Sequence, residues 1–266
     1  MAITALYTAA TGMQATSTKI DVIANNIANA DTPGFKASRA NFQDLLYQIQ
    51  AQPGVQTSED SSTPLGTEVG LGVALSNTQT IFKQGSATPT GEPLDLMIQG
   101  DGFFELELPG GATGYTRAGN FVRNANGELV LGNSYGYRLK DSPTIPQDVS
   151  RDHVGISSDG RITATQPDGT VQELGQLKLA RFVNPSGLLQ RGANVFTSTQ
   201  ASGEPIEGTA GTQGLGEIMS ANLEQSTTEA VAELVELIKA QRIFQMNSQT
   251  IMAADQSLQT VTNLRR

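Results

Sequence analysis

The sequence offers few side chains in patterns that could carry out chemistry. Residues 132–136, GNSYG, match the G-x-S-x-G pattern of a hydrolase nucleophile elbow, in which Ser134 would be the nucleophile. That elbow requires a helix directly after the serine, and then an acid and a histidine in chain order. The residues that follow here, YRLKDSPTIP, include two prolines, and the chain has a single histidine, His153. We therefore interpret residues 132–136 as a turn after a strand, with a hydrolase that depends on Ser134 or His153 as the alternative.

Metal and phosphate chemistry have no better support. Asp152 precedes His153 and Glu59 precedes Asp60, but carboxylates without further ligands at suitable spacing do not build a metal cage. The chain has no cysteine, which excludes thiolate sites and disulfides. The glycine-rich stretch GTEVGLG, residues 66–72, lacks the lysine of a phosphate-binding loop, and we predict turns there. The sequence thus predicts no catalytic residue, no metal and no cofactor, and a protein that is not an enzyme.

Composition excludes two classes of partner. The 266 residues carry a net charge of −9, and their 17 scattered basic residues do not form the clusters that bind nucleic acid. No apolar run approaches the roughly 18 residues that a membrane span needs. No positive charge precedes Lys19, so the charged segment of a cleavable signal peptide is missing. Taken alone, this N-terminus predicts a cytoplasmic protein.

The first thirty residues predict an amphipathic helix, because apolar or small residues recur at alternating steps of three and four, as in a heptad seam. The seam residues are Ile3, Leu6, Ala10, Met13, Ser17, Ile20, Ala24 and Ile27. The helix is weak by itself, because it contains several β-branched threonines and Gly12. We expect the terminal helices to become well ordered only when neighbouring chains cover their seams.

The C-terminus predicts a second helix of the same kind. Its seam residues are Leu237, Ala240, Phe244, Asn247, Ile251, Ala254, Leu258 and Val261. Ser226 and Glu229 have the spacing of a capping box, which places the start near residue 227 and gives a length on the order of 50 Å. Asn247 is an amide in an otherwise apolar or small seam. We hypothesise that it fixes helix register, with a solvated edge position as the alternative. Two ordinary core helices that meet in a bundle are the alternative for the pair.

Between the helices, the apolar pattern changes to a period of two, which predicts half-buried strands. Phe104, Leu106 and Leu108 alternate with Glu105 and Glu107, and Leu177 and Leu179 alternate with Gln176 and Lys178. Dipeptides suited to tight turns separate such runs, namely Asn126-Gly127, Asp159-Gly160 and Asp168-Gly169. The middle of the chain is therefore predicted to be a hairpin-rich β-domain. Residues 47–66, YQIQAQPGVQTSEDSSTPLG, lack a continuous apolar face, and their composition alone predicts a flexible linker.

The stretch ANNIANADTPGFK, residues 24–36, resembles the signature of the bacterial flagellar rod and hook proteins. The matching residues are Asn25, Asn26, Asn29, Thr32, Gly34, Phe35 and Lys36. Residues 98–130 are similar to the first segment of the family's β-domain, and residues 233–251, ELVELIKAQRIFQMNSQTI, are similar to its C-terminal helix. The resemblance covers essentially the whole chain. One departure is Ser226-Thr227-Thr228, where the family usually has Ser-Asn-Val.

The resemblance implies that residues 25–36 form an assembly joint. Amide side chains would satisfy backbone groups where the helix ends, Pro33 would prevent continuation of the helix, and Phe35 would anchor the departing chain. An ordinary helix stop is the alternative, because the same residues would serve it.

Within the family, residues 44–73 resemble the corresponding segment of the distal-rod members. This resemblance implies that residues 47–66 are an extended brace that contacts a neighbouring subunit, reaching tens of ångströms at roughly 3.3 Å per residue. The brace residues would be Tyr47, Ile49, Pro53, Val55, Pro64 and Leu65. The two prolines would lower the entropy lost when the segment orders, and the apolar residues would anchor it in grooves.

The fold that follows is mixed α and β, with long N- and C-terminal helices in a coiled-coil-like inner layer and a hairpin-rich all-β central domain. The expected parts are residues 1–33, the N-terminal helix of the core domain; 34–69, the joint and extended segment; 70–220, the β-domain; and 221–266, the C-terminal helix. The resemblance implies a structural subunit that polymerises into a straight, rigid helical tube, with the helices as inner wall and the β-domain as outer wall. A hook or proximal-rod subunit and a secreted cell-wall hydrolase are the alternatives.

The resemblance also implies partners and a location. The partners would be further copies of the chain, proximal-rod subunits, hook or hook-junction subunits, the flagellar export apparatus and the ring proteins that surround the rod. No nucleic acid and no membrane span are expected. The tube would transmit motor torque to the hook and would cross the periplasm within the basal body. Flagellar export needs no cleaved signal peptide, so the family resemblance replaces the cytoplasmic prediction.

Overall fold

The computed structural model describes residues 2–52, 56–58, 61–62, 65–166 and 169–264. The chain divides into two compact units. The helical unit consists of Met1–Ala28, Ser38–Gln79 and Glu229–Arg266, and the β unit consists of Asn29–Ala37 and Thr80–Thr228. Residues 24–36, which carry the family resemblance, therefore belong partly to each unit.

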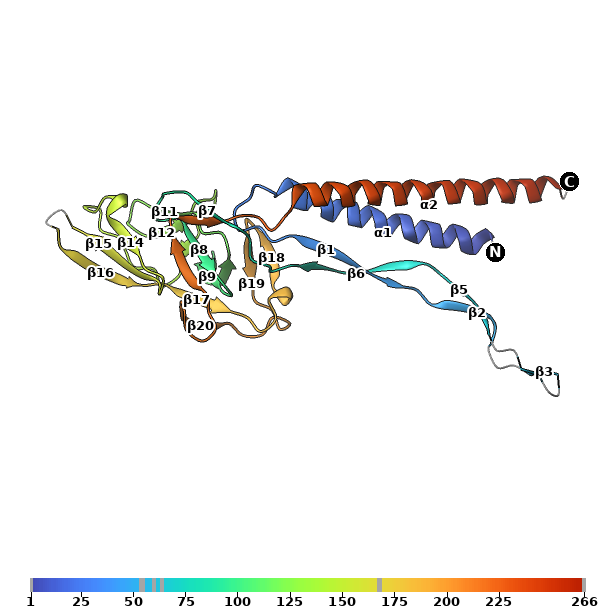
Figure 1. Ribbon diagram of the computed structural model, residues 1–266, viewed down its shortest axis with the longest axis horizontal. Coiled ribbons are helices and arrows are strands. Elements are labelled where there is room, and N and C mark those ends of the chain that lie inside the picture. Colours follow the sequence, from blue (N-terminus) through green and yellow to red (C-terminus); the bar gives the residue numbers. More distant parts are fainter. Residues whose placement is uncertain (1, 53–55, 59–60, 63–64, 167–168, 265–266) are drawn as a thin grey trace. The chain divides into compact units, whose positions relative to one another are not determined.

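The helical unit contains two antiparallel helices that lie side by side (Figure 1). They are α1 (Ala2–Ala28) and α2 (Ala230–Leu264). At about 1.5 Å per residue, the 35 residues of α2 extend roughly 50 Å, as the sequence predicts. The Lys19 ammonium lies 2.9 Å from the Glu236 carboxylate, which ties α1 to the first turns of α2.

The start of α2 differs from the prediction. The helix begins at Ala230, and the Ser226 hydroxyl accepts a hydrogen bond from the Thr228 backbone N–H at 3.2 Å, outside the helix. Thr227 is held in a different pairing, because its N–H donates to the Phe35 carbonyl at 3.1 Å and its hydroxyl accepts from the Ala37 N–H at 2.9 Å. These bonds keep the segment extended, so the predicted capping box does not form.

The packed face of α1 lies one residue away from the predicted seam. Of that seam, Leu6, Met13, Ile20 and Ile27 are half-buried, Ala10, Ser17 and Ala24 are exposed, and the side chain of Ile3 lies outside the described part. The buried residues are Ala9, Ala15, Thr16, Ile23 and Asn26. One residue is about 100° of helix rotation. The face of α1 that this chain itself buries is thus offset from the predicted seam, and the cover of that seam by neighbouring chains stays a prediction.

On α2 the predicted seam coincides with the packed face. Ala240 is fully buried, and Asn247 lies against Gly12 of α1. Leu237, Asn247, Ile251, Ala254 and Leu258 are half-buried, Phe244 is more exposed, and the side chain of Val261 is not described. Asn247 therefore contacts α1 and is not a wholly solvated edge residue.

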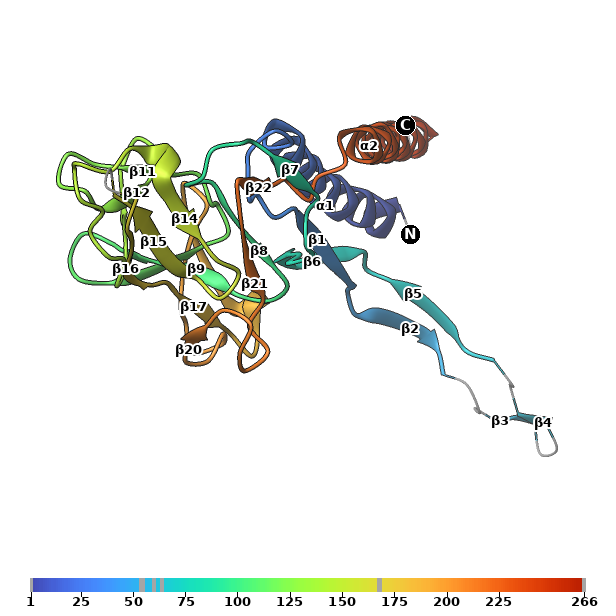
Figure 2. The same ribbon diagram turned by 60° about the vertical axis from the view of Figure 1, so that its left-hand side comes forward.

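The described parts of residues 38–79 form a long antiparallel hairpin, shown in Figure 2. The paired strands are β1 (Ser38–Asp44) with β6 (Val73–Thr80), β2 (Tyr47–Ala51) with β5 (Thr67–Gly70), and β3 (Gln56–Ser58) with β4 (Ser61–Ser62). The structure thus corrects the single extended segment expected for residues 47–66: the described part of it folds back on itself. It also corrects the turns expected for GTEVGLG, because residues 67–70 lie in β5, where they pair with β2.

The β unit is built on a nine-stranded antiparallel sheet. The strands of its main path are, in spatial order, β11 (Phe121–Arg123), β12 (Leu129–Leu131), β13 (Arg138–Leu139), β9 (Phe103–Glu107), β10 (Thr113–Thr116), β19 (Val195–Thr197) and β18 (Leu189–Gly192). Off this path, β17 (Lys178–Arg181) pairs with β9 and with β20 (Ile206–Thr209). A three-stranded sheet contains β14 (Val154–Ile156), β15 (Arg161–Thr165) and β16 (Val171–Gln176). Two strand pairs complete the unit, β8 (Leu96–Gln99) with β21 (Glu217–Ser220) and β7 (Ala87–Pro89) with β22 (Asn222–Glu224).

The core of the β unit covers both faces of β9. Phe104 and Leu106 belong to the large apolar cluster, and Phe103 belongs to a second, aromatic cluster with Phe182 and Phe196. Glu105, predicted to face solvent, is therefore buried, and the Lys140 ammonium compensates it at 2.7 Å. The period-two pattern misplaces this residue because it assumes that only one face of the strand is covered.

The predicted tight turns join strands where the structure describes them. Asn126-Gly127 connects β11 to β12, with Gly127 at φ +86°, and Asp159-Gly160 connects β14 to β15, with Gly160 at φ +84°. Asp168 lies outside the described residues, as do Glu59 and Asp60. Among the described helices, none combines the length and apolar character needed to cross a membrane.

Candidate assembly joint

Asn26 organises the part of the signature that lies in the helical unit. Its side chain is buried at the end of α1 and exchanges two hydrogen bonds with the backbone of Ser38: Nδ2 donates to the carbonyl at 2.8 Å, and Oδ1 accepts from the N–H at 3.0 Å. The same Nδ2 donates to the Glu233 carboxylate at 3.1 Å. Asn26 thereby fixes the end of α1, the start of β1 and the first turns of α2. Asn25, one position earlier, is exposed.

Residues 29–35 form consecutive turns in the β unit. The Thr32 N–H and hydroxyl donate to the carbonyl and the Oδ1 of Asn29, each at 3.2 Å, and the Phe35 N–H donates to the Thr32 carbonyl at 3.2 Å. The Pro33 carbonyl accepts from Asn194 Nδ2 at 2.9 Å. α1 ends at Ala28, before Pro33, so the Asn29 turn and not the proline directly follows the helix. Phe35 is half-buried.

Gly34 meets two requirements that only glycine satisfies easily. Its φ is +71°, and an added Cβ would come within 2.6 Å of the Ala118 backbone nitrogen. Its own N–H donates to the Glu224 carbonyl at 2.8 Å. The signature therefore packs backbone against backbone here, beside the strand that leads the chain out of the β unit.

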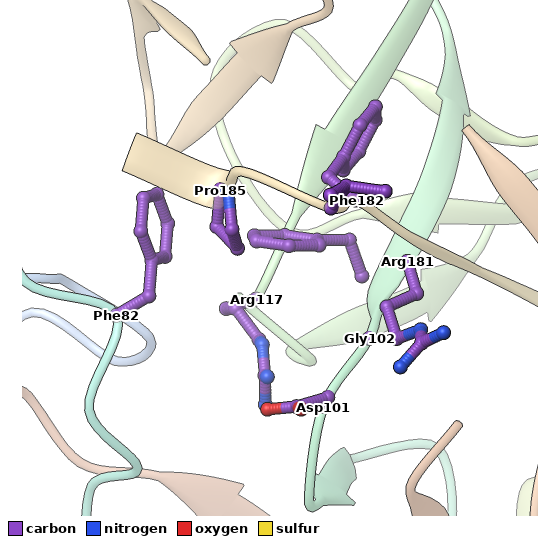
Figure 3. A pocket seen from close by; sticks show the side chains of 9 residues that line it. Phe82, Asp101, Gly102, Arg117, Arg181, Phe182 and Pro185 are labelled. Atoms are coloured by element: carbon purple, nitrogen blue, oxygen red, sulfur yellow. The ribbon is translucent and has the colours of Figure 1, made fainter. Parts of the chain in front are cut away.

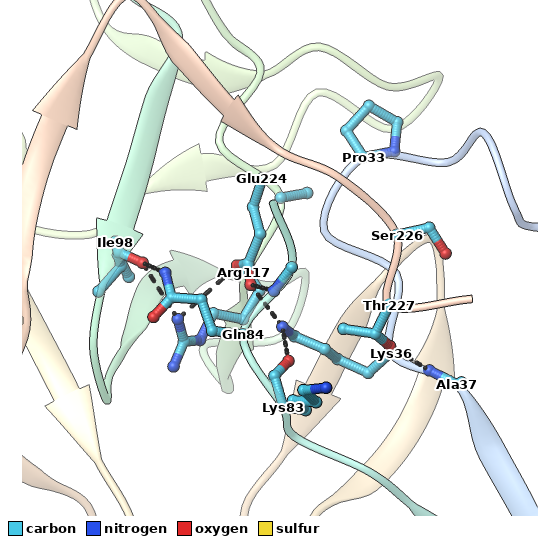
Figure 4. Close-up of polar contacts among 12 residues, drawn as sticks. Pro33, Lys36, Ala37, Lys83, Gln84, Ile98, Arg117, Glu224, Ser226 and Thr227 are labelled. Atoms are coloured by element: carbon cyan, nitrogen blue, oxygen red, sulfur yellow. Dashed lines mark hydrogen bonds and ion pairs between the residues drawn. The ribbon is translucent and has the colours of Figure 1, made fainter. Parts of the chain in front are cut away.

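Lys36 is the buried charge of the signature. Its side chain is 1% exposed, and its ammonium donates to the Glu224 carboxylate and to the Lys83 carbonyl, both at 2.6 Å. The Gly85 N–H donates to the same Glu224 oxygen at 2.8 Å, and Arg117 lies 3.7 Å from the other. Figure 4 shows this group of residues, which we call the buried ion cluster: Lys36, Arg117 and Glu224. Burial lowers the pKa of Lys36, and the Glu224 carboxylate opposes that shift.

The rest of the cluster is held by the backbone of β8. Arg117 donates to the carbonyls of Ile98 at 3.4 Å and Gly100 at 2.8 Å, and its guanidinium lies 5.3 Å from the centre of the Phe103 ring. Gln84 supports the same strand end by donating to the Ile98 carbonyl at 2.7 Å and accepting from the Gly100 N–H at 2.7 Å. Sequence reasoning missed Glu224 and Arg117. Nothing in the sequence indicated that Lys36 is buried, and nothing pointed to its partner.

The helical unit exposes many large apolar side chains. On α2, outside the predicted seam, they are Val231, Leu234, Val235, Ile238, Ile243, Met246 and Met252, which we call the apolar face of α2. On the hairpin they are Phe42, Leu46, Tyr47, Ile49, Leu65 and Leu75, with Leu46 and Leu65 more than 80% exposed. Of the predicted brace residues, Tyr47, Ile49 and Leu65 are thus exposed, and Pro53, Val55 and Pro64 lie outside the described residues. Large apolar side chains that gather exposed on one helix and one hairpin are typical of interaction sites.

The motif that suggested a hydrolase lies in a different context. Residues 132–136 connect β12 to β13 as a hairpin turn, not a strand to a helix, and Ser134 is exposed. His153 is exposed in a short 3₁₀ helix, Arg151–His153. Among the described residues, no group of three or more histidines, cysteines or carboxylates could hold a metal.

Comparison with known proteins supports the same interpretation. Three family models match the chain: flagella basal body rod protein over residues 6–36, flagellar hook protein FlgE/F/G D1 domain over 97–164, and flagellar basal body rod FlgEFG protein C-terminal over 219–264. The flagellar basal-body rod protein FlgG of Caulobacter vibrioides is 44% identical, with 98% of this chain and 99% of that protein covered. FlgG of Borreliella burgdorferi is 40% identical, with 98% of each chain covered. The flagellar hook-basal body complex protein FlhP of Bacillus subtilis is 30% identical, again over 98% of each.

These findings define a structural protein of the bacterial flagellum, located in its basal body. The chain belongs to the flagellar basal-body rod protein family.

Proposed function

We propose that the chain polymerises through its helical unit into the straight, rigid tube of the distal rod, which transmits torque to the hook. The observation that carries this proposal is the apolar face of α2. The packing of α1 covers Ala240 but leaves residues such as Val231 and Met246 78% and 57% exposed. Burying apolar surface gives about 25 cal/mol per Å², so neighbouring helical units gain much by covering this face. In a homopolymer, every subunit has further copies of α2 as its neighbours.

The same exposed surface supports export before assembly. A helix pair whose contacts are completed by neighbours loses little stability when the chain travels unfolded, and it gains its full stability when the subunit joins the tube. The export apparatus, proximal-rod subunits, hook or hook-junction subunits and the surrounding ring proteins are the proposed partners. The proposed route is export without a cleaved signal peptide into a tube that crosses the periplasm. The proposed role includes no catalysis, because the serine motif lies in a hairpin turn.

The hairpin of residues 38–79 supplies a second proposed contact between subunits. A two-stranded ribbon is marginally stable by itself, and this one exposes Leu46, Tyr47, Ile49 and Leu65. We assign it the bracing role proposed for residues 47–66, now as a paired ribbon. Contact with a neighbouring subunit would cover its apolar side chains and would stop subunits from sliding, which keeps the tube straight.

Replacing two residues of the apolar face tests polymerisation. Leu234 and Ile238 lie four residues apart on one side of α2, and both are exposed. The double variant Leu234→Glu, Ile238→Glu should remain a folded monomer that forms no tubes in electron micrographs at concentrations where the parent does. Gln241→Glu with Gln245→Glu is the matched control, because it adds the same two charges at exposed polar positions of the same helix. Tubes equal to those of the parent from the Leu234, Ile238 variant would refute the proposal.

A further inference from the structure

A pocket of about 320 Å³ in the β unit combines an apolar wall with two arginines (Figure 3). Phe82, Phe103, Phe182 and Pro185 form the apolar part, and Arg117 and Arg181 bring the guanidinium groups. None of these residues belongs to the helix surfaces that carry the proposed polymerisation.

The two arginines differ in their compensation. Arg117 is 5% exposed and has Glu224 at 3.7 Å, two carbonyl acceptors and a nearby carboxylate, Asp101, which favours its charged form. Arg181 is half-buried, and within the described part of the chain its side chain makes no hydrogen bond or ion pair. Its Nε is fully buried without an acceptor, and its guanidinium lies against Gly214. The half-buried guanidinium therefore has no carboxylate partner among the described residues and can pair with an external anion.

The charge of the pocket is unlike the charge of the chain. Lys36, Arg117 and Arg181 outnumber the carboxylates of Glu224 and Asp101, so the pocket and the buried ion cluster behind it keep one positive charge. The chain as a whole carries −9. A second copy of the chain is therefore rich in the group that the pocket lacks. The exposed Val183, 82% accessible beside Phe182, adds an apolar rim at the mouth of the pocket.

We propose that this pocket receives an acidic side chain of a neighbouring copy of the chain, whose carboxylate pairs with Arg181 while its apolar stem packs against the phenylalanines. This inference rests on the proposed homopolymer and adds a contact between β units to the contacts of the helices. A planar guanidinium suits a carboxylate because it offers two parallel N–H donors. In a heterologous contact, the pocket of one subunit and the acid of the next would repeat along the tube.

Polymerisation of Arg181 variants tests the assignment, with the critical concentration of the purified full-length protein as readout. Arg181→Gln should raise it about tenfold, the equivalent of about 1.4 kcal/mol, and Arg181→Glu should raise it further by repulsion. Arg181→Lys should give an intermediate value, because it keeps the charge but loses the planar pair of donors. Val183→Glu, at an exposed position on the rim of the pocket, should also raise the critical concentration by repelling the incoming acid.

Two further readouts separate a docking contact from a merely structural role. The thermal midpoint of each monomer should equal that of the parent, because Arg181 has no partner within the described chain. Added salt should raise the critical concentration of the parent more steeply than that of Arg181→Gln. Arg161→Gln is the control: it removes an exposed arginine already paired with Asp159 at 2.8 Å, and it should change nothing.

The outcomes also separate the two proposals. If the parent forms tubes and Arg181→Gln and Arg181→Glu form them at the same concentration, the docking pocket is refuted and the homopolymer stands. If the parent forms no tubes, both are refuted. An equal salt dependence for the parent and Arg181→Gln would show that Arg181 meets no carboxylate, which also overturns the assignment.

Discussion

Gly12 of α1 lies directly against Asn247 of α2: a Cβ added to Gly12 would come within 2.9 Å of the Asn247 amide nitrogen. Gly12 destabilises α1 through its backbone entropy, but because it has no side chain it leaves room for the Asn247 amide between the helices. Asn247 was singled out from the sequence as an amide in a mostly apolar seam. The structure shows that Asn247 packs where Gly12 of the facing helix has no side chain.

This contact predicts a measurable coupling between the two residues. Alanine at an exposed helix position stabilises by about 1 kcal/mol relative to glycine. Gly12→Ala should show this gain in full only in an Asn247→Ala background, because the alanine methyl group otherwise displaces the Asn247 amide. Chemical unfolding followed by far-ultraviolet circular dichroism gives the double-mutant cycle. Equal gains in both backgrounds would mean that the two side chains do not compete for the same space.

Replacing Asn247 with leucine tests its role in register. Leucine can fill the gap at Gly12 without requiring one fixed pairing, so Asn247→Leu should give polymers that are no weaker but less uniform. Helical order in electron micrographs is the measurement. Asn247→Gln, which keeps the amide, is the control. Order identical to the parent for the leucine variant would count against a register role.

Breaking the buried ion cluster should strongly destabilise the β unit. Lys36→Met keeps most of the side-chain volume but leaves the Glu224 carboxylate, 0% exposed, without its ammonium partner. The expected loss is about 3–5 kcal/mol in the free energy of unfolding. Lys178→Met is the matched control, because Lys178 pairs with Asp141 at 2.9 Å but both side chains are about half exposed. The control should lose no more than about 1 kcal/mol.

Thermal unfolding of these two variants compares the losses directly. Adding Glu224→Gln to Lys36→Met should recover part of the loss, because it removes the unpaired charge. A loss for Lys36→Met as small as that of Lys178→Met would show that the cluster contributes little.

The helix pair should lose stability in acid. Hydrogen bonds from Lys239 and then Lys19 lower the pKa of Glu236 from 4.5 to about 2. A carboxyl group with a lowered pKa in the folded state binds protons more readily when unfolded, so its contribution is present above pH 4.5 and is lost as the pH falls toward 2. The melting of the helices should therefore depend on pH in that window, and Glu236→Gln should flatten the dependence. An unchanged slope in the variant would assign the effect to other carboxylates.

Deleting residues 47–66 tests the brace. We expect export and polymerisation to persist, because the apolar face of α2 is untouched, but the tubes should become curved. Curvature in electron micrographs is the measurement. A variant that replaces residues 47–66 with a Gly-Ser chain of equal length is the control, because it keeps the connection while removing the apolar contacts, and it should curve as well. Straight tubes from both variants would show that the segment is only a linker.

The sequence by itself determined the kinds of elements and much of their placement. Heptad spacing predicted both terminal helices, and on α2 it predicted the packed positions, because Ala240 and Asn247 face α1 there. The dipeptides Asn126-Gly127 and Asp159-Gly160 predicted turns correctly, since a positive φ is a local requirement that few residues meet. The signature predicted a helix end before the β-domain, but α1 ends at Ala28 and not at Pro33, and the function of the signature residues in assembly stays a prediction.

The tertiary structure alone decided which residues meet. The packed face of α1 is one residue away from the apolar seam, because α1 packs both against α2, where Gly12 meets Asn247, and against the hairpin, where Thr11 approaches Gly72. Residues 47–66 look like a linker, but their described part pairs in a ribbon, because backbone hydrogen bonds need no apolar pattern. Lys36 forms its ion pair with Glu224, which lies far away in the sequence. A buried charge shows that a partner must exist, but only the fold determines which carboxylate is brought within 2.6 Å.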